Sequence, residues 1–119
     1  MNTNEKGNFG EELAVNHIVS KGYKILERNW RFGHLEIDII ALNNDTIVFI
    51  EVKTRNSNFV VEPELSLSKK QQSFLIRAAN QYLDKSPLDL EARFDIISVV
   101  LHPEGFELKQ IEEAFYPYA

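Results

Sequence analysis

Two apolar segments of the chain carry charged side chains that could act together. Glu36 and Asp38 lie in LEIDIIALN, and Glu51 and Lys53 lie in TIVFIEVKTR, a short polar stretch later. Carboxylates buried near one another repel, so they need compensating positive charge. A lysine offsets one acid, whereas a divalent cation offsets more, and hard cations such as Mg²⁺ prefer oxygen ligands. The pattern therefore predicts a metal site.

Such a site suits hydrolysis of a phosphodiester bond. Two of the acids, the backbone carbonyl of Val52 and water would complete an octahedral set of oxygen ligands. Lys53 beside the metal would orient or help to deprotonate an attacking water, while the metal stabilises the developing charge. The alternative is an ordinary ion-pair pattern at strand ends, with Lys53 and the acids facing water.

The two segments are expected to pair as an antiparallel hairpin, because Asn43-Asn44-Asp45 forms a tight turn between them. Side chains alternate across a strand, so each segment has two predicted faces. In the first segment these are Glu36, Asp38, Ile40 and Leu42 against Leu35, Ile37, Ile39 and Ala41. In the second they are Ile47, Phe49, Glu51 and Lys53 against Val48, Ile50 and Val52.

Both faces of both strands are largely apolar, as in central strands covered by helices. Pairing across Asn44 sets Asp38 opposite about Ile50, next to Glu51. The charged side chains are therefore expected at one end of a buried surface.

The remaining chain is expected to supply two helices and further strands. The predicted helices span 8–21 and 66–84, and the predicted strands span 23–32, 34–42, 46–54 and 93–102, with a short edge strand or turn over 106–115. Gly22 should end the first helix, Ser66 or Ser68 should cap the second, and 55–65 should be a loop. The expected class is α/β: a central mixed sheet, made of a three-stranded antiparallel meander and a further strand, flanked by helices in the order αβββαβ.

Composition sets outer limits on this interpretation. A chain of 119 residues with 44% hydrophobic residues predicts one domain over residues 1–119. The sequence has no cysteine, no apolar run of membrane-spanning length and no apolar signal-peptide core near its polar start. A cytoplasmic protein is therefore expected. The net charge of −5 disfavours strong, non-specific binding of nucleic acid.

The spacing of Asp38 from Glu51-Val52-Lys53 resembles that of the PD-(D/E)XK nuclease superfamily. A closer resemblance is to the YraN-like family of small bacterial proteins. It is carried by GNFGEELA (7–14), GYKILERNWR (22–31), LEIDIIA (35–41), VFIEVKTR (48–55), the lysine-rich start of the second helix and RFDII (93–97). The resemblance covers nearly the whole chain and implies a restriction-endonuclease-like core.

The resemblance also implies an activity. It implies a metal-dependent endonuclease that hydrolyses phosphodiester bonds in DNA, including branched or structured DNA, with Mg²⁺ or Mn²⁺. Asp38, Glu51 and Val52 would be metal ligands, and Glu36 and Lys53 would join the catalytic set. The sequence departs from the pattern at Leu35, where the family has glycine, and it lacks the superfamily proline before the first acid.

Glu11 is a further candidate catalytic and metal-binding residue. It lies on the apolar stripe of the first predicted helix with Ala14, Val15 and Ile18, where a carboxylate is unusual. The resemblance implies that it reaches the metal directly or through water. The alternative is an acid of the first turn that stabilises the helix dipole.

Basic residues supply candidate contacts to nucleic acid. Lys69 and Lys70 open the second predicted helix, where positive charge opposes the helix dipole unless an anion binds there. Lys70 and Gln71 also match the family's lysine-glutamine position. The predicted nucleic-acid contacts are Lys69, Lys70, Gln71, Arg55 and Arg31. The alternative for the lysines is a solvated pair.

Three other features are expected to be structural. Asp95 should pair with Arg93 or another base, Trp30 and Phe32 should pack in the core, and His34 should lie in a turn. The alternatives are that Asp95 lies near the active site, that the two aromatic residues stack on a base, and that His34 touches substrate. Two further functions compete with a nuclease: a nucleic-acid-binding module that cuts little or nothing alone, and a non-catalytic interaction protein. A homodimer would double the DNA footprint and suit cleavage of two strands.

Overall fold

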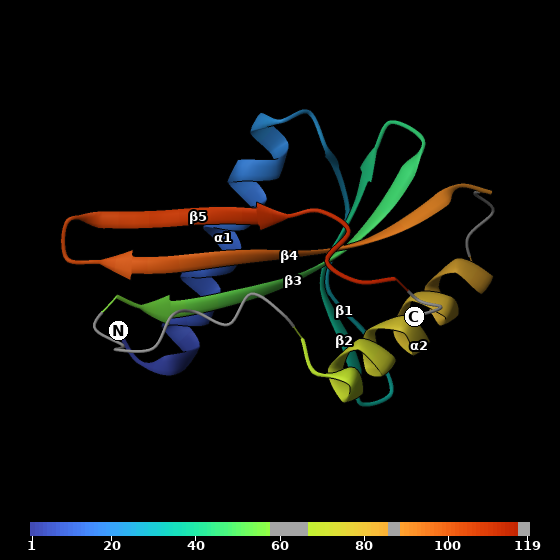
Figure 1. Ribbon diagram of the computed structural model, residues 1–119, viewed down its shortest axis with the longest axis horizontal. Coiled ribbons are helices and arrows are strands. Elements are labelled where there is room, and N and C mark those ends of the chain that lie inside the picture. The colour runs from blue at the N-terminus through green and yellow to red at the C-terminus, as the bar shows by residue number, and fades with distance from the viewer. Residues whose placement is uncertain (58–66, 86–88, 117–119) are drawn as a thin grey trace.

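A mixed five-stranded sheet with one helix packed on each face forms the structure (Figure 1). The computed structural model describes residues 1–57, 67–85 and 89–116. The elements in chain order are α1 (Thr3–Ser20), β1 (Lys24–Phe32), β2 (Leu35–Asn43), β3 (Thr46–Asn56), α2 (Lys69–Asp84), β4 (Glu91–His102) and β5 (Gly105–Ile111). The order αβββαββ confirms the predicted core and adds β5 as a true strand.

The strands lie in chain order across the sheet, so β1 and β5 are its edges. β3 and β4 run parallel, and every other neighbouring pair is antiparallel. The connection between parallel strands must cross over, and α2 lies in this connection. No helix among the described residues is long and apolar enough to span a membrane.

Each face of the sheet has its own apolar cluster. The cluster under α2 includes Ile40, Ile47, Phe49, Leu75, Ala78, Phe94 and Ile96. The cluster under α1 includes Ala14, Ile18, Ile39, Ala41, Val48, Ile50, Ile97 and Val99. Both predicted faces of the β3 segment are therefore confirmed: Ile47 and Phe49 pack under α2, whereas Val48 and Ile50 pack under α1.

A glycine sets the distance between α1 and β3. A Cβ atom added at Gly10 would overlap the side chain of Thr54 on β3, whereas one added at Gly7 would meet no atom within 4 Å. Glycine at position 10 thus lets α1 approach the sheet closely, as a packing glycine does. This approach brings the neighbouring Glu11 toward the ends of β2 and β3.

The ends of both helices follow from their sequences. Asn2 and Ser68 cap α1 and α2, each in a capping box with the residue three positions later. Gly22, with φ of 91°, follows the last turn of α1 and confirms the predicted stop. The helix begins at Thr3 rather than at residue 8, so Glu11 lies well inside it. The alternative of a first-turn acid at Glu11 is therefore wrong.

β2 separates from β3 partway along its length. The last β2–β3 pair is Ile39 with Ile50, but β2 stays paired with β1 as far as Leu35 and Phe32. β3 meanwhile stays paired with β4 as far as Asn56 and Leu101. A fork between β2 and β3 therefore opens just beyond Ile39 and Ile50, and Figure 1 shows β1 and β2 turning steeply away from β3, β4 and β5.

Three sequence-based expectations need correction. The register differs by one residue, because Ile39 rather than Asp38 pairs with Ile50. The predicted faces of the first segment are wrong, since Leu35 and Ile37 pack in the cluster of Ile40, under α2, while Ile39 and Ala41 pack under α1. Side-chain alternation breaks at Asp38 because β2 bends away there.

The third correction concerns the loop predicted over 55–65. Arg55 and Asn56 belong to β3, where they continue the parallel ladder with β4. Residues 58–66 of that loop, with the candidate cap Ser66, lie outside the described residues.

Candidate active site

Asp38 on β2 and Glu51 on β3 face each other where the two strands separate. We use the name fork for the three residues at this place: Asp38, Glu51 and Val52. Without a β2 carbonyl to bind, the Val52 N–H donates to Asp38 Oδ2 at 2.8 Å. An extended residue directs its N–H and C=O to the same side of the strand, so the Val52 carbonyl also faces the fork. The bend in β2 thus replaces a ladder hydrogen bond with a carboxylate, and it exposes a backbone oxygen.

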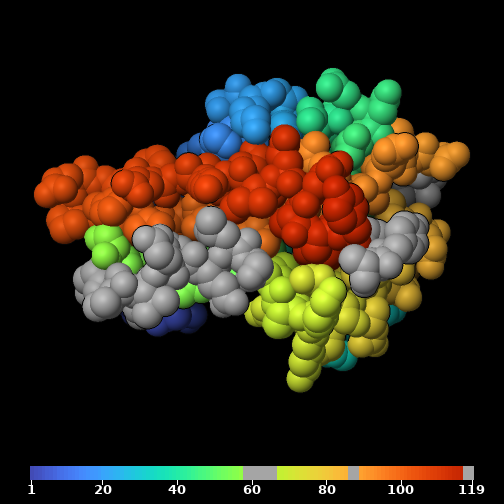
Figure 2. Space-filling view, in the orientation of Figure 1, coloured from blue at the N-terminus to red at the C-terminus, as the bar shows by residue number. Residues whose placement is uncertain are grey.

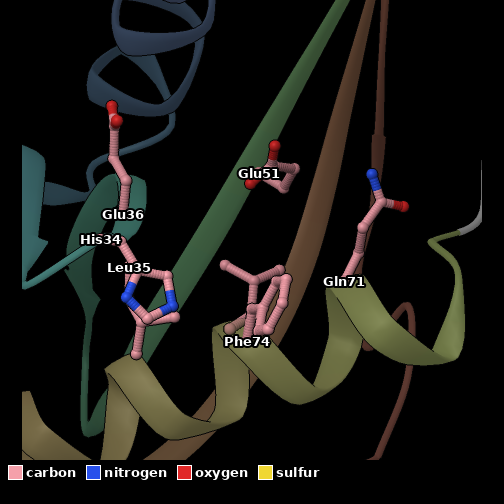
Figure 3. A pocket seen from close by; sticks show the side chains of 7 residues that line it. His34, Leu35, Glu36, Glu51, Gln71 and Phe74 are labelled. Carbon is pink, nitrogen blue, oxygen red and sulfur yellow. The ribbon is translucent and has the colours of Figure 1, made fainter.

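Glu51 has no charge partner at hydrogen-bond distance in the part of the chain that the structure describes. Its carboxylate is half-buried, and no described residue donates a hydrogen bond to it or forms an ion pair with it. Glu51 lines a cavity of about 200 Å³ together with His34, Leu35, Glu36, Gln71, Phe74 and Leu75. Figure 3 shows Glu51 on β3 between the start of β2 and the first turns of α2. The fork is therefore open to a ligand from the α2 side.

The negative charge of the acids at the fork is only partly compensated by neighbouring groups. Burial raises the pKa of Asp38, and Glu11 and Glu36 raise it further, against the opposing hydrogen bond from Val52. Burial also raises the pKa of Glu51, to which Asp38 adds repulsion, and the charge of Lys53 offsets only part of this. Each carboxylate is thus held above its ordinary pKa by burial and by neighbouring acids, which is the environment a bound cation relieves.

A second pair of acids, Glu11 and Glu36, lies beside the fork. Burial raises the pKa of Glu11, with Arg28 opposing and Glu36 adding to the rise. With the Asn29 amide turned so that its nitrogen faces the acids, that nitrogen donates to Glu11 Oε1 at 2.9 Å and to Glu36 Oε1 at 3.2 Å. Asn29 therefore links the two acids and lets them approach each other.

The fork fits a hydrated hard cation. Among the described residues, no three His, Cys, Asp or Glu side chains converge closely enough to hold a metal by themselves. Mg²⁺, however, keeps several waters and needs only one or two protein carboxylates. Asp38, Glu51 and the Val52 carbonyl are oxygen donors of that kind, and Glu11 and Glu36 add negative charge beside them.

Lys53 lies on β3 two residues after Glu51, which places both side chains on one face of the strand. It is half-buried, and its charge lowers the pKa of Glu51. The structure thus brings together the acid, acid and lysine of the predicted set, with Glu36 and Glu11 at its margin.

The predicted nucleic-acid contacts fall into two groups. Gln71 lines the cavity beside Glu51, although its Oε1 already accepts hydrogen bonds from Ser68 in the capping box. Lys69 and Lys70 are exposed in the first turn of α2, which has no acid. They do not line the cavity, so only Gln71 joins the fork directly.

The two predicted arginines lie apart from each other. Arg31 is exposed on β1 and forms a 3.2 Å ion pair with Glu36, so it neutralises an acid at the margin of the fork. Arg55 is half-buried on β3, and its Nε atom is buried without a partner among the described residues. Arg55 shares the strand face of Lys53.

Asp95 belongs to a separate cluster on the α1 face, as expected of a structural acid. Its buried carboxylate accepts hydrogen bonds from Arg93 Nε (2.9 Å), Gln110 Nε2 (2.9 Å) and the Glu113 N–H (3.1 Å). Arg93 also donates to Tyr23 Oη at 2.8 Å. Burial lowers the pKa of Arg93, but its hydrogen bonds to Asp95 and Tyr23 raise it more, so the guanidinium stays charged.

The remaining predictions are also resolved. Trp30 packs edge-on against Tyr82 with ring centroids 5.3 Å apart, which confirms its place in the core. Phe32 stacks on Trp30 with ring centroids 6.5 Å apart but is 38% exposed and belongs to neither apolar cluster, so the prediction that it packs in the core is wrong. His34 lies in the turn before β2, as predicted, yet it also lines the cavity.

Sequence reasoning missed two residues that shape the site. Asn29 carries a signal, since its φ of 51° is the left-handed conformation that asparagine tolerates better than most residues. Gly10 is a glycine inside a helix, which costs stability unless packing requires it. In both cases the residue type hinted at a role, but only the partners in the fold reveal it.

The mixed sheet, the helix on each face and the fork with its acids define a restriction-endonuclease-like core. The model of the uncharacterised protein family UPF0102, the YraN family, matches residues 10–99. The chain belongs to this family.

Bacterial relatives extend the match to nearly full length. The chain is 43% identical over 115 residues to UPF0102 protein FP2501 of Flavobacterium psychrophilum, covering 97% of each chain. It is 40% identical over 114 residues to a UPF0102 protein of Bacteroides thetaiotaomicron, covering 96% of this chain and 94% of the relative.

Proposed function

We propose that this protein is a metal-dependent endonuclease that hydrolyses phosphodiester bonds in DNA, including branched DNA. Asp38, Glu51 and the Val52 carbonyl would hold Mg²⁺ or Mn²⁺, with Glu11 and Glu36 beside them. The absence of cysteine fits a cytoplasmic setting for this activity.

One observation carries the proposal: two half-buried carboxylates meet where β2 leaves β3, and one of them has no partner among the described residues. Retaining such repulsion without a ligand would cost stability. A divalent cation removes the repulsion and polarises a phosphoryl oxygen when bound.

The chain's own groups account for the remaining steps. Lys53 would orient the attacking water with its N–H donors or help to deprotonate it. The cavity lined by Glu51, Gln71 and Phe74 accepts the scissile phosphate from the α2 side. Lys69 and Lys70 attract the DNA backbone, because the first turn of α2 carries their charges without an acid.

The test is a cleavage assay with matched substitutions. Purified protein is incubated with Mg²⁺ or Mn²⁺ and labelled linear, flapped and four-way DNA, alongside Asp38→Asn and Lys53→Met. The controls are Asp45→Asn and Lys24→Met, which alter exposed residues of the same types outside the fork. We expect Asp38→Asn and Lys53→Met to lose at least about 100-fold in rate, while both controls cleave like the wild type.

A second function, binding of nucleic acid with little cleavage, is favoured by the exposed Lys69 and Lys70. Fluorescence anisotropy with the same DNA separates the two functions. Binding that weakens in Lys69→Gln/Lys70→Gln, with no cleavage of any substrate, would support the binding module. Cleavage that persists in Asp38→Asn and Lys53→Met would reject the assigned site. Neither binding nor cleavage would leave the interaction protein as the remaining candidate.

A further inference from the structure

The two edges of the sheet differ in how open they are to another strand. β1 is irregular, with a register shift between Ile25 and Glu27 and a left-handed residue at Asn29. Such bulges blunt an edge against pairing. β5 pairs with β4 without a register shift from Ile96–Ile111 to His102–Gly105. The outer side of β5 therefore presents a regular row of backbone groups, and no described strand covers it.

The residues of β5 that offer these groups follow from the β4–β5 turn. His102 pairs with Gly105 across a two-residue loop, and such flanking residues direct their backbone groups toward each other. The backbone groups of Glu107, Lys109 and Ile111 consequently point to β4. Those of Phe106, Leu108 and Gln110 point outward, so the free edge has three residues available for hydrogen bonding.

We propose that β5 pairs antiparallel with β5 of a second copy of this chain, across a two-fold axis at Leu108. Leu108 is the midpoint of Gly105–Ile111, so this register pairs the whole strand. In this register the backbone hydrogen bonds between the two copies are made by the Leu108–Leu108 pair and the two Phe106–Gln110 pairs. These are the residues whose backbone groups point outward. The two sheets become one continuous sheet, and each copy uses the same surface, as a two-fold interface requires.

Charge selects this register over its neighbours. With the axis at Leu108, Glu107 of each copy lies opposite Lys109 of the other, which gives two cross-strand pairs of opposite charge. With the axis at Glu107 or at Lys109, a like-charged pair would lie on the axis instead. Lys109 is exposed and has no partner among the described residues, while Glu107 has only His102, at 3.5 Å.

The side chains that meet across the axis also suit burial. Leu108 packs with the cluster under α1, and Gln110 bonds Asp95 on the same face, so Phe106 projects to that face too. Phe106 is 49% exposed. Pairing sets it against Gln110 of the second copy, whose Oε1 accepts a 2.8 Å hydrogen bond from Lys21, just after α1.

The C-terminal end of α1 offers a surface against which the added strand can pack. Figure 1 shows α1 crossing the sheet obliquely, with its C-terminal end beyond the β5 edge. In Figure 2 this end lies next to the C-terminal part of β5, whose remaining length forms a rim of the molecule in this view. A strand added to β5 would lie against the end of α1, with its Phe106 directed toward the helix.

The proposal is tested by charge reversal, with light scattering after size exclusion as the readout. We expect the wild type at twice the chain mass of 13.8 kDa. Lys109→Glu sets glutamates opposite one another and Glu107→Lys sets lysines opposite one another, so each variant should be monomeric. Mixed together, the two variants should re-form a dimer, because each then meets the opposite charge. The Glu107→Lys/Lys109→Glu double variant should also be dimeric.

Cross-linking fixes the register, because the natural chain has no cysteine. An equimolar mixture of Glu107→Cys and Lys109→Cys should form a disulfide-linked dimer under mild oxidation, whereas each variant alone should not. A monomeric wild type, or a Lys109→Glu variant that keeps the dimer mass, would overturn the proposal. Circular dichroism checks that every variant is folded. None of these readouts depends on DNA cleavage.

Discussion

The fork and the Asp95 cluster both bury carboxylates beside the same sheet, but they satisfy them differently. Asp95 has no exposed side-chain surface and forms a 2.9 Å ion pair with Arg93. Gln110 and the Glu113 backbone complete its hydrogen bonds. Asp38 accepts one backbone hydrogen bond, and Glu51 accepts none from any described residue. Hydrogen bonding and charge compensation therefore separate a fully satisfied carboxylate from two whose charge is compensated only in part.

This difference distinguishes structural acids from candidate functional acids better than burial alone. Asp95 is the more deeply buried, yet its partners come from β4, β5 and the segment after β5, so it joins elements together. The fork lies where two paired strands part, and its Glu51 lines a cavity. A buried acid with a complete set of protein partners stabilises the fold, whereas a half-buried acid without them is a candidate ligand.

The largest expected effect on stability is at Asp95. Asp95→Asn removes the charge that Arg93 compensates and leaves the guanidinium with the longer 3.4 Å ion pair to the half-exposed Glu112 as its charge partner among the described residues. We expect a loss of about 3 kcal/mol in the free energy of unfolding, measured by urea denaturation. Asp45→Asn, in the exposed turn between β2 and β3, should change it little. A fully stable Asp95→Asn variant would contradict the assignment of this cluster as structural.

A smaller loss is expected where α1 approaches the fork. Gly10→Ala forces α1 away from Thr54 and should cost about 2 kcal/mol. Gly7→Ala in the same helix meets no neighbouring atom and should stabilise the protein by up to about 1 kcal/mol. Thermal denaturation compares the two. Equal effects would show that the close approach at Gly10 is not required.

Neutralising an acid of the fork should instead increase the free energy of unfolding. Asp38 and Glu51 have a raised pKa in the fold, so their contribution to stability is complete below the ordinary carboxyl pKa and is lost as pH rises through the raised pKa. Without divalent cations, the wild type should therefore become less stable from about pH 4 upward. At about pH 8, Asp38→Asn and Glu51→Gln should each gain about 1 kcal/mol.

The same variants reveal the cation. Mg²⁺ should raise the midpoint of thermal unfolding of the wild type, because ligands that bind the folded state stabilise it. It should not do so for Asp38→Asn, while Asp45→Asn should respond like the wild type. Equal Mg²⁺ responses in Asp38→Asn and the wild type would show that the fork is not the metal site.

The smallest effect is expected at Asn29. Asn29→Gly keeps the left-handed backbone but removes the amide between Glu11 and Glu36, so the pKa of Glu11 should rise further and stability should fall by about 0.5 kcal/mol. Carboxyl NMR titration measures the pKa. Asn44→Gly, at a residue with φ of 54° in the β2–β3 turn, is the matched control and should leave the pKa of Glu11 unchanged.

Much of the architecture follows from local sequence patterns. The helical stripe of α2, its cap at Ser68, the two-residue turn before β3 and the two-sided burial of β3 are all set by residues close in the chain. The acid and lysine types at 38, 51 and 53 also identified the candidate chemistry. These features were predictable because residue spacing in helices and strands is periodic.

Tertiary structure decided how the acids meet. The bend at Asp38 depends on where β2 stops pairing with β3, which β1 and α2 influence from distant parts of the chain. The link through Asn29, the approach at Gly10 and the completeness of the Asp95 cluster likewise need partners remote in sequence. The sequence by itself thus determined which groups are available and on which elements. Long-range packing determined which of them are left without a partner, because hydrogen bonds and compensating charges are fixed only when separate elements come together.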